Sequence, residues 1–517
     1  MEERLYTAEE VRRLDQAAMN GGIPGLVLME RAGEAVAAAI EAHWPDWRRF
    51  RVGVLAGGGN NGGDGYVVAR RLRELGGAPE LIAAADPGRL RGDAAHAAER
   101  WRDAGGDVHS VPDTLAGYDL LVDALLGTGL DREVRSPYRE LIEEAAACPA
   151  PVVAVDIPSG LNADTGRVLG AAAPAEVTVT FVGLKRGLFT GDGPGIVGEV
   201  RYEGLGIPEA IRSEVPVNGR RLTVGPLRQE PRPANAHKGH FGRVVVAGGA
   251  PGTTGAAVMA GWSALRSGAG WVVCCLPPET SPLATAHRPE LMTAVWDPEA
   301  GLPAELGGGG AVAVGPGLGR SDAARRVLEA ALARPVPLVI DADGLSLLAE
   351  HDGLRDALDR RGEPTVLTPH PGEAARLLGC DSGSIQEDRF GSARRITEKY
   401  NAVCCLKGAG TIIQAPDGQY AVSPTGNPGM SMAGQGDILT GVLAAQLAQN
   451  GGAPLLATCR AVWAHGRAAD RVAQERGPFG YAATECADAL PGVWRELTNY
   501  QGHEPNRPKR RDHAQGK

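Results

Sequence analysis

The sequence predicts an α/β protein made of two tandem three-layer α/β/α domains. Short runs rich in Val, Leu, Ile and Ala alternate with helical runs along the whole chain. These runs lack a strict alternation of apolar and polar residues, which is typical of strands buried on both faces of a parallel sheet. The length of 517 residues also favours more than one domain, because a single core rarely grows beyond roughly 250–300 residues.

The expected strands end in residues that suit ligand binding. Most of them end in Gly, Asp, Ser or Lys. In doubly wound sheets, ligands bind beyond the carboxyl ends of the strands, so these positions are the first candidates for functional sites. The clearest strand-like runs are 51–56, 120–124, 151–156, 243–247, 311–315, 337–341, 365–368 and 402–407.

A polar, proline-bearing segment divides the chain. Its character changes between about Gly204 and Gly239, where the apolar strand-like runs stop and then restart. Such a change is typical of a domain boundary. We therefore expect one domain over 1–218 and a second over 219–500, followed by a polar tail, 501–517, that is disordered.

The composition argues against several classes of protein. The net charge is -9 with no long basic run before the tail, so nucleic-acid binding is not expected. No apolar run approaches the length of about 18 residues that a membrane span needs, and the N-terminus lacks a signal-peptide pattern, so a cytoplasmic protein is expected. The eight cysteines are scattered without a CxxC pair, which favours reduced, buried thiols over a zinc site.

A glycine-rich run follows the first expected strand. Residues 57–65 read Gly-Gly-Gly-Asn-Asn-Gly-Gly-Asp-Gly and precede an expected helix over 66–75. The run contains the GxGxxG spacing, which glycine-rich stretches also produce by chance. Asn60, Asn61 and Asp64 are unusual in a plain dinucleotide-binding turn, and their oxygens suit ribose hydroxyls or a monovalent cation. The alternative is a tight strand-to-helix turn without a ligand.

Two further strand ends carry acids. Asp123 lies at the tip of one apolar strand, and Asp156 ends another, just before Ile-Pro-Ser159. A solvated charge is not expected at such a tip. Each acid alone is compatible with a loop cap. Together with the glycine-rich run they predict one shared pocket, because the carboxyl ends of parallel strands meet at one edge of the sheet.

These loops resemble the NAD(P)HX epimerase family over about residues 7–206. The matching stretches are Gly-Gly-Asn-Asn-Gly-Gly-Asp-Gly, the Asp-Ala-Leu-Leu-Gly-Thr-Gly loop, Asp-Ile-Pro-Ser-Gly-Leu and the segment from Gly22 to Gly33. The resemblance implies a Rossmann-like fold, usually dimeric, with Asp156 as the substrate-binding and proton-transfer acid. It implies a potassium ion held by Asn61, Asp123 and Ser159. The residues implied to line the hydrated nucleotide are Asn60, Asn61, Gly62, Gly63, Asp64, Gly127, Thr128, Gly129, Leu130, Asp131, Arg132 and Glu133.

The most informative stretch of the C-terminal half is a glycine-rich loop over 423–437. It ends in a lone acid, Asp437, and an expected helix over 438–447 follows. Glycines and the unpaired N–H groups of a helix start can hold a phosphate. Asp437 would repel that phosphate, so the chemical interpretation is that it accepts a proton from a hydroxyl that attacks the phosphate. The alternative is an acid that caps the helix.

Four other strand ends of this half carry candidate motifs. Lys407 and the Gly-Ala-Gly-Thr that follows it could present a charge, backbone N–H groups and a hydroxyl to phosphates, although this is not a Walker loop. His370 lies between two prolines, where a plain turn histidine is the alternative. Asp341 and Asp343 are equally compatible with strand-end caps. The four motifs span 248–257, 315–319, 367–373 and 406–411.

This half resembles the ADP/ATP-dependent NAD(P)H-hydrate dehydratases of ribokinase-like fold, over about residues 222–496. Gly-Asn-Pro-Gly-Met and Gly-Gln-Gly-Asp-Ile-Leu-Thr-Gly are its most specific pieces. Gln435 stands where relatives often have a small residue, and Ser431 and Met432 also vary. The resemblance implies that Ala256, Gly317, His370 and Asp437 contact the hydrated nicotinamide nucleotide. The residues implied to contact the adenine nucleotide are Lys407, Gly408, Ala409, Gly410, Thr411 and Gly436.

The two resemblances together imply a bifunctional repair enzyme for NADHX and NADPHX, the hydrated forms of NADH and NADPH. One half would interconvert the R and S epimers, and the other would dehydrate the S form after phosphorylating its hydroxyl from ADP or ATP. ADP is favoured by the domain order and the Arg-rich composition. K⁺ in the first half, Mg²⁺ in the second and a homo-oligomer are expected. The alternatives are a small-molecule kinase with an accessory N-terminal half, and a nucleotide-sensing or protein-binding N-terminal module.

Overall fold

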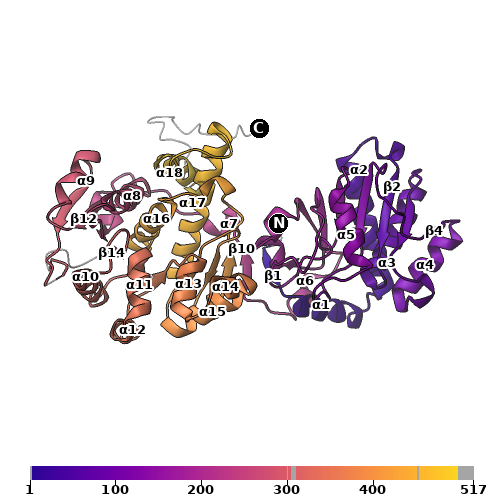
Figure 1. Ribbon diagram of the computed structural model, residues 1–517, viewed down its shortest axis with the longest axis horizontal. Coiled ribbons are helices and arrows are strands. Elements are labelled where there is room, and N and C mark those ends of the chain that lie inside the picture. Colours follow the sequence, from indigo (N-terminus) through magenta and orange to yellow (C-terminus); the bar gives the residue numbers. More distant parts are fainter. Residues whose placement is uncertain (1–2, 300, 304–309, 451–452, 499–517) are drawn as a thin grey trace, which may run out of the picture.

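The computed structural model describes residues 3–299, 301–303, 310–450 and 453–498. The two halves of the chain form two α/β lobes, which meet near β1 and β10 (Figure 1). Every strand expected from the runs given above is present, and the α/β fold class is confirmed. The tail expected to be disordered, 501–517, lies outside the described residues.

An entirely parallel seven-stranded sheet forms the centre of the N-terminal lobe, in the order β4-β3-β2-β5-β6-β7-β9. Val54 of β2 packs in one apolar cluster with α2, α3 and α4, while its neighbour Leu55 packs in another with α5. Helices therefore cover both faces. The strands are β2 Val52–Ala56, β3 Glu80–Ala83, β4 Val108–His109, β5 Leu120–Ala124, β6 Val152–Val155, β7 Val177–Phe181 and β9 Glu199–Glu203. The helices are α1 Ala8–Asn20, α2 Gly25–His43, α3 Asn60–Glu74, α4 Gly92–Asp103, α5 Tyr138–Ala147 and α6 Glu209–Arg212.

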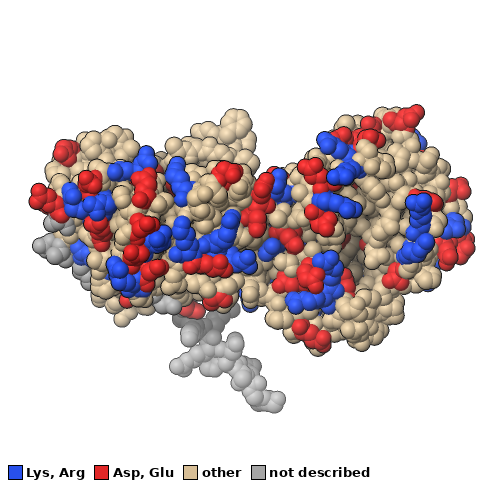
Figure 2. Space-filling view, turned by 60° about the horizontal axis from the view of Figure 1, so that its bottom comes forward, with Lys and Arg blue, Asp and Glu red and all other residues tan. Residues whose placement is uncertain are grey.

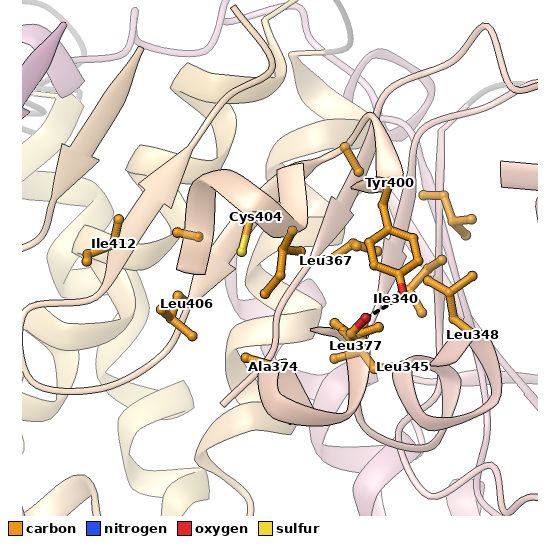
Figure 3. Close-up of a cluster of buried hydrophobic side chains, with 14 of the residues drawn as sticks. Ile340, Leu345, Leu348, Leu367, Ala374, Leu377, Tyr400, Cys404, Leu406 and Ile412 are labelled. Atoms are coloured by element: carbon orange, nitrogen blue, oxygen red, sulfur yellow. Dashed lines mark hydrogen bonds between the residues drawn. The ribbon is translucent and has the colours of Figure 1, made fainter. Parts of the chain in front are cut away.

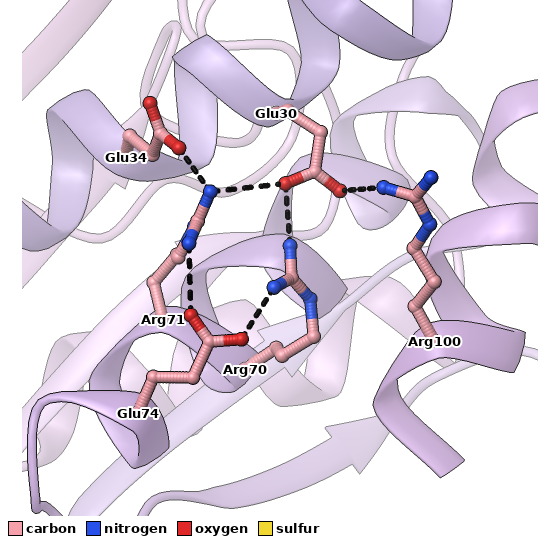
Figure 4. A network of polar contacts seen from close by, with 6 residues as sticks. All are labelled: Glu30, Glu34, Arg70, Arg71, Glu74 and Arg100. Atoms are coloured by element: carbon pink, nitrogen blue, oxygen red, sulfur yellow. Dashed lines mark hydrogen bonds and ion pairs between the residues drawn. The ribbon is translucent and has the colours of Figure 1, made fainter. Parts of the chain in front are cut away.

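An ion-pair network ties three helices on one face of this sheet (Figure 4). Glu30 of α2 accepts hydrogen bonds from Arg70 of α3 and, at 2.8 Å, from Arg100 of α4. Arg71 joins the network through Glu74 at 2.8 Å. Glu30 and Arg70 are both mostly buried, so these pairs are screened less by solvent than ordinary surface pairs.

A 12-stranded sheet runs through the C-terminal lobe in the order β13-β12-β11-β14-β15-β16-β17-β18-β19-β10-β1-β8. Its parallel section runs from β13 to β17, and the strands from β12 to β17 are buried between two layers of helices. Its strands in this lobe are β10 Gly219–Arg221, β11 Arg243–Ala247, β12 Trp271–Leu276, β13 Met292–Val295, β14 Ala311–Val314, β15 Leu338–Ile340, β16 Thr365–Leu367, β17 Val403–Leu406, β18 Ile412–Gln414 and β19 Tyr420–Val422. The helices are α7 Val224–Leu227, α8 Thr254–Arg266, α9 Ser281–His287, α10 Asp322–Leu332, α11 Ala342–Glu350, α12 Asp352–Asp359, α13 Pro371–Leu378, α14 Ser382–Glu387, α15 Arg389–Tyr400, α16 Gln435–Gln449, α17 Pro454–Arg476 and α18 Ala483–Thr498.

The two faces of this parallel section carry separate apolar cores. Val244 and Val246 of β11 pack with α8, α16, α17 and α18, whereas Val245 and Ala247 pack with α10, α11, α13 and α15. Figure 3 shows part of the second core, where Ile340 and Leu367 meet helix side chains and the Tyr400 hydroxyl donates to the Leu377 carbonyl at 3.1 Å. The three-layer arrangement expected for this half is therefore confirmed.

The 12-stranded sheet crosses the expected domain boundary at Asn218. Strand β1 (Arg4–Tyr6) pairs antiparallel with β10, and β8 (Leu184–Lys185) pairs parallel with β1. Strand β10 in turn pairs with β19. Two short strands from the N-terminal half thus complete the sheet of the C-terminal lobe.

Charged side chains of both signs are interspersed over the face shown in Figure 2. Within the described ranges, none of the helices combines the length and the apolar character that crossing a membrane requires.

Candidate active sites

A cavity of about 1010 Å³ lies at the carboxyl end of the N-terminal sheet. It unites the three strand-end loops that the sequence singled out, since Asn60, Asn61, Asp64, Asp156 and all residues of 127–133 line it. Gly62 and Gly63 do not line it and are buried against the protein; a Cβ atom at Gly62 would lie 1.9 Å from the Gly57 carbonyl oxygen.

The helix behind this cavity begins earlier than the sequence predicted. Helix α3 starts at Asn60 rather than Tyr66, so the Asn-Asn-Gly-Gly-Asp stretch forms its first turns instead of a preceding loop. The reason is that Gly62 and Gly65 allow the helix to pack directly on the strand ends, where larger residues would collide with Gly57 and Ala124. The asparagine and aspartate side chains are thereby fixed on a helix.

The three residues expected to hold potassium lie beside the cavity. Asp123 and Ser159 are buried and joined, with the Ser159 hydroxyl donating to Oδ1 at 2.5 Å and its N–H donating to Oδ2 at 2.8 Å. Burial raises the pKa of Asp123 despite these hydrogen bonds. The Asn61 amide is also buried, and neither Oδ1 nor Nδ2 has a hydrogen-bond partner in the described part of the chain. An orphaned amide oxygen near a buried carboxylate fits a weakly charged cation.

Asp156 lies at the wall of the cavity in a strained backbone conformation. Its φ of 68° is in the left-handed region, which costs a non-glycine residue of order 1–3 kcal/mol unless the surroundings enforce it. The Phe181 N–H donates to its carboxylate at 3.1 Å, and the buried Lys185 ammonium donates to the same oxygen. Lys185 also donates to Thr180 Oγ1 at 3.0 Å and to the Phe181 carbonyl at 2.9 Å. All three ammonium protons are used, so Lys185 acts as a fixed positive charge beside Asp156.

In the C-terminal lobe, Asp437 lies in the first turn of α16. The helix starts at Gln435, with Gly434 at the N-cap in a left-handed conformation (φ 94°) and without a side-chain cap hydrogen bond. Asp437 therefore does not cap the helix, and the alternative interpretation of it as a helix cap is wrong.

Lys407 lies beside this helix start and neutralises a different acid. Its ammonium is 2.8 Å from Asp341 Oδ1 and 3.6 Å from Glu373 Oε2. Burial would lower the pKa of Lys407, but these carboxylates outweigh it and raise that pKa. Thr440 of α16 donates to Asp341 Oδ2 at 2.8 Å, so Asp341 bridges the helix and the lysine. A Cβ atom at Gly436 would lie 3.4 Å from the Lys407 ammonium, which places the helix N-terminus against this charge.

The charge around Asp437 makes it a base suited to neutral pH. Burial, followed by the repulsion of Asp341, raises its pKa to about 7, although Lys407 opposes the shift. Asp343 and Glu373 add to the repulsion. A group with this pKa can both accept and release a proton near neutrality.

The other residues expected in this site come from the strand-end loops. Ala256 lies in the first turn of α8, and Gly317 (φ 57°) packs against the N-cap of that helix through Thr253. His370 caps α13, because its Nδ1 accepts from the Gly372 N–H at 3.0 Å and leaves the proton on Nε2. His370 is thus the N-cap residue of α13 rather than a plain turn histidine, and its Nε2–H remains available as a hydrogen-bond donor. Residues 408–411 form the turn between β17 and β18.

Comparison with known proteins assigns both lobes. The family described as YjeF-related protein N-terminus matches residues 25–187, and the family described as NAD(P)H-hydrate dehydratase matches residues 244–492. The bifunctional NAD(P)H-hydrate repair enzyme of Coxiella burnetii is 41% identical over 93% of this chain and 97% of its own length. That of Escherichia coli is 39% identical over 97% and 96%, respectively.

This chain belongs to the family of bifunctional NAD(P)H-hydrate repair enzymes. Among solved structures, an ADP/ATP-dependent NAD(P)H-hydrate dehydratase from Bacillus subtilis, co-crystallized with ATP and Mg²⁺, is 31% identical, with a TM-score of 0.47 over 53% of this chain and 95% of that one.

Sequence reasoning missed one acid of the repair enzyme's first cavity. Asp15 of α1 lines the cavity together with Asp64, Asp156 and Lys185. Burial raises the pKa of Asp15 to about 6, with Asp156 adding to the effect and Lys185 opposing it. Burial also raises the pKa of Asp64 well above its usual value. Asp15 precedes every strand-end motif and carries no local pattern, so only the packing of α1 against the sheet reveals it.

The unusual Gln435 of this repair enzyme is held by the helices behind α16. Its side chain is buried, with Oε1 at 2.9 Å from His465 Nε2 and Nε2 donating to Cys486 Sγ at 3.4 Å. Burial lowers the pKa of His465 to about 4, so the imidazole is neutral and Nε2–H is the donor. These contacts fix the side chain of the first residue of α16.

Proposed function

We propose that this chain repairs hydrated NADH and NADPH at two separate sites. The cavity around Asp156 would interconvert the R and S epimers of NADHX and NADPHX, and the site around Lys407 and Asp437 would dehydrate the S epimer with ADP or ATP. The observation that carries this proposal is the presence of both constellations on one chain that is 41% identical to a bifunctional repair enzyme. The division at Asn218 into an epimerase part and a dehydratase part belongs to the same proposal.

Epimerisation inverts a carbon that bears both a hydroxyl and the ring nitrogen. In our proposal, protonated Asp15 gives its proton to the C6 hydroxyl, the C6–O bond breaks to release water, and the N1 lone pair forms an N1=C6 bond. Water then adds to the other face of C6 and loses a proton to the Asp156 carboxylate. Lys185 would hold the Asp156 carboxylate in place by direct contact. The reverse reaction uses the two acids in exchanged roles. In repeated turnovers in one direction, Asp156 releases its proton to solvent and Asp15 takes one up, so atoms and protons balance over a cycle.

Dehydration needs a better leaving group than hydroxide. We assign to Asp437 the removal of the C6 hydroxyl proton as the oxygen attacks the terminal phosphorus of ADP or ATP and the bond to AMP or ADP breaks. Loss of phosphate from C6 and of a proton from C5 then forms the C5=C6 bond of the reduced nucleotide. The N–H groups at the start of α16 and the Lys407 charge would stabilise the transferred group. Ala256, Gly317 and His370 are assigned to the hydrated nucleotide, and 407–411 with Gly436 to the adenine nucleotide.

Both sites contain ligands suited to the expected cations. Asn61, Asp123 and Ser159 supply only oxygens and one formal charge, which suits K⁺. Near Asp437, the carboxylates of Asp343 and Glu373 are oxygen donors of the kind Mg²⁺ prefers. When bound, Mg²⁺ would neutralise charge on the transferred phosphate.

We also propose a homo-oligomer in a reducing cytoplasm. The eight cysteines are all free, which is typical of such a compartment. Met292 and Val295 of the edge strand β13 expose apolar surface that a second copy could cover.

One assay tests the proposed function. The enzyme is incubated with separated R-NADHX and S-NADHX and either ADP or ATP, and the return of NADH absorbance is followed. Both epimers should yield NADH, with AMP or ADP and phosphate as the other products, and the assay also settles ADP against ATP. A stable phosphorylated nucleotide would favour a small-molecule kinase. Conversion of the S epimer alone would favour a non-catalytic N-terminal module.

A further inference from the structure

The turn between β17 and β18 contacts the N-terminal half of the chain. The buried Thr190 hydroxyl donates to the carbonyl of Ala409 at 3.2 Å and to that of Gly410 at 3.0 Å. The N–H of the next residue, Gly191, also donates to the Ala409 carbonyl, at 3.3 Å. Residues more than 200 positions apart therefore share one hydrogen-bonded cluster.

This contact leaves no room for a side chain at Gly410. A Cβ atom there would lie 1.7 Å from the carbonyl oxygen of Phe189, and its φ of 61° is in the left-handed region. No rotation of a side chain relieves a clash with backbone. The second glycine of the Lys-Gly-Ala-Gly-Thr motif is thus required by the neighbouring lobe, independently of any phosphate.

Arg389 holds the same cluster from behind. Its Nε–H donates to the Thr190 hydroxyl oxygen at 3.1 Å, and Nη2 lies 3.3 Å from the Leu406 carbonyl and 3.4 Å from that of Lys407. The side chain is fully buried, and burial lowers its pKa to about 10. Burying a guanidinium whose partners are neutral carbonyls and one hydroxyl lowers the free energy of unfolding. Such a loss is understandable if Arg389 is needed to hold the backbone of this turn in one conformation.

The contact determines which way the turn presents its N–H groups. In a planar trans peptide the C=O and the following N–H point in opposite directions. Since Thr190 holds the carbonyls of Ala409 and Gly410, the N–H groups of Gly410 and Thr411 point away from it. Neither N–H has an acceptor within the described ranges of the chain. Successive free N–H groups in a turn form a concave site for an anion.

We infer that Thr190 is a positioning residue for the adenine nucleotide of the dehydratase, although it belongs to the epimerase half. It orients the peptides of residues 409–411 so that their N–H groups face the phosphates of ADP or ATP. This inference rests on the proposed assignment of that turn to the nucleotide. The alternative is a purely structural role, in which Thr190 only stabilises the contact between the two lobes.

The test compares isosteric and conservative variants by calorimetry with ADP and with ATP. Thr190→Val removes the hydroxyl and keeps the shape, and it should raise the Kd about 5- to 20-fold, as expected for peptide groups that lose a buried partner. Thr190→Ser should restore binding to within about twofold of wild type. In dehydration assays, the KM for the nucleotide should rise more than kcat falls, because the reacting groups are untouched.

A matched control removes another buried threonine hydroxyl of the same half. Thr178 is fully buried and donates to the Val197 carbonyl at 2.7 Å, far from the turn in sequence and on another sheet. Thr178→Val should leave nucleotide affinity unchanged. Arg389→Lys keeps the charge but removes the Nε–H donor to Thr190, and it should weaken nucleotide binding in the same direction; it keeps the test decisive if Thr190→Val does not fold.

A Lys407→Gln variant separates the two ways of failing. If it weakens nucleotide binding while Thr190→Val and Arg389→Lys bind normally, the positioning role is wrong and the proposed function stands. If Lys407→Gln also binds normally, the assignment of the turn to the nucleotide is wrong, and this inference fails with it. Equal losses in the Thr178 and Thr190 variants would show a general effect of destabilising the lobe.

Discussion

The two candidate sites each pair a lysine with an acid, but they pair it differently. In the N-terminal lobe, Lys185 contacts the reacting acid, Asp156, directly. In the C-terminal lobe, Lys407 contacts Asp341 at 2.8 Å, and the reacting acid, Asp437, is left without an ion-pair partner within the described ranges. In the first site the ammonium holds the reacting acid in place, and in the second site burial and the repulsion of Asp341 raise the pKa of the reacting acid to about 7. The two sites thus differ in whether the ammonium contacts the reacting acid or a neighbouring one.

The largest effect is expected at the unpaired acid. Asp437→Asn removes the proton acceptor, so dehydration of S-NADHX should fall by about 10²–10⁴-fold. Nucleotide affinity should hold or rise, because a negative charge beside the phosphate is lost. Kinetics on S-NADHX and calorimetry with ADP or ATP measure the two effects, and epimerase activity serves as the folding control. Normal dehydration would exclude Asp437 as the base, whereas a loss of nucleotide binding would recast it as a Mg²⁺ ligand.

The paired acid should be equally indispensable, but only for the other activity. Asp156→Asn should lower epimerisation by about 10²–10⁴-fold and leave dehydration of pure S epimer unchanged. Because the variant keeps its own dehydratase, the rate at which it forms NADH from R-NADHX with excess ADP or ATP isolates this step. Parallel loss of both activities would instead indicate misfolding or a shared site.

Asp15 should matter less, because water can replace a proton donor in part. Asp15→Asn is expected to lower epimerisation by about 10–10²-fold. Its pKa of about 6 predicts that kcat/KM falls as pH rises through about 6 in the wild type, since the protonated form is the donor. In the Asp15→Asn variant, kcat/KM should no longer show this alkaline limb, the decrease as pH rises through about 6. Asp64→Asn is the matched control, because it changes an acid in the same cavity that is assigned to binding; it should raise KM and retain the limb.

The dehydratase should show the opposite pH dependence, which is the mildest of these effects near neutrality. Asp437 must be ionised to act as a base, so kcat/KM should decline as pH falls through about 7, by about tenfold per unit well below it. Measuring both activities of one preparation between pH 5 and about 9 compares them directly. Parallel profiles would contradict the assignment of Asp15 as a proton donor and of Asp437 as a base.

The sequence predicted the strands and the strand-end loops because buried parallel strands leave a strong signal of their own. It correctly united the loops of Asn61, Gly127 and Asp156 around one cavity, since parallel strands share a carboxyl edge. The start of α3 was placed too late, because glycines that permit close helix packing read as a loop. Asp15, Thr440 and Thr190 carry no local pattern; each acquires its contacts only when distant elements pack together.

Strands β1 and β8 could not be predicted for a related reason. Each has only two or three residues, and β1 pairs with strands that are distant in the sequence, namely β8 and β10, the latter ending at Arg221. Runs this short have no periodicity to detect. The position of the boundary at Asn218 was therefore inferred from composition, without any sign that one sheet spans it.

The place of β1 in that shared sheet has a consequence for the order in which the chain folds during synthesis. Strand β1, Arg4–Tyr6, acquires its antiparallel partner only after β10 has left the ribosome, and β10 in turn is extended by β19 at residues 420–422. Until then β1 and β8 can pair only with each other, which leaves a short open sheet edge at the surface of an otherwise complete N-terminal lobe. Closing this part of the sheet is a late, long-range event. The turn that contacts Thr190 would acquire its final shape in the same step, so dehydratase activity is expected to appear only after the two lobes have joined.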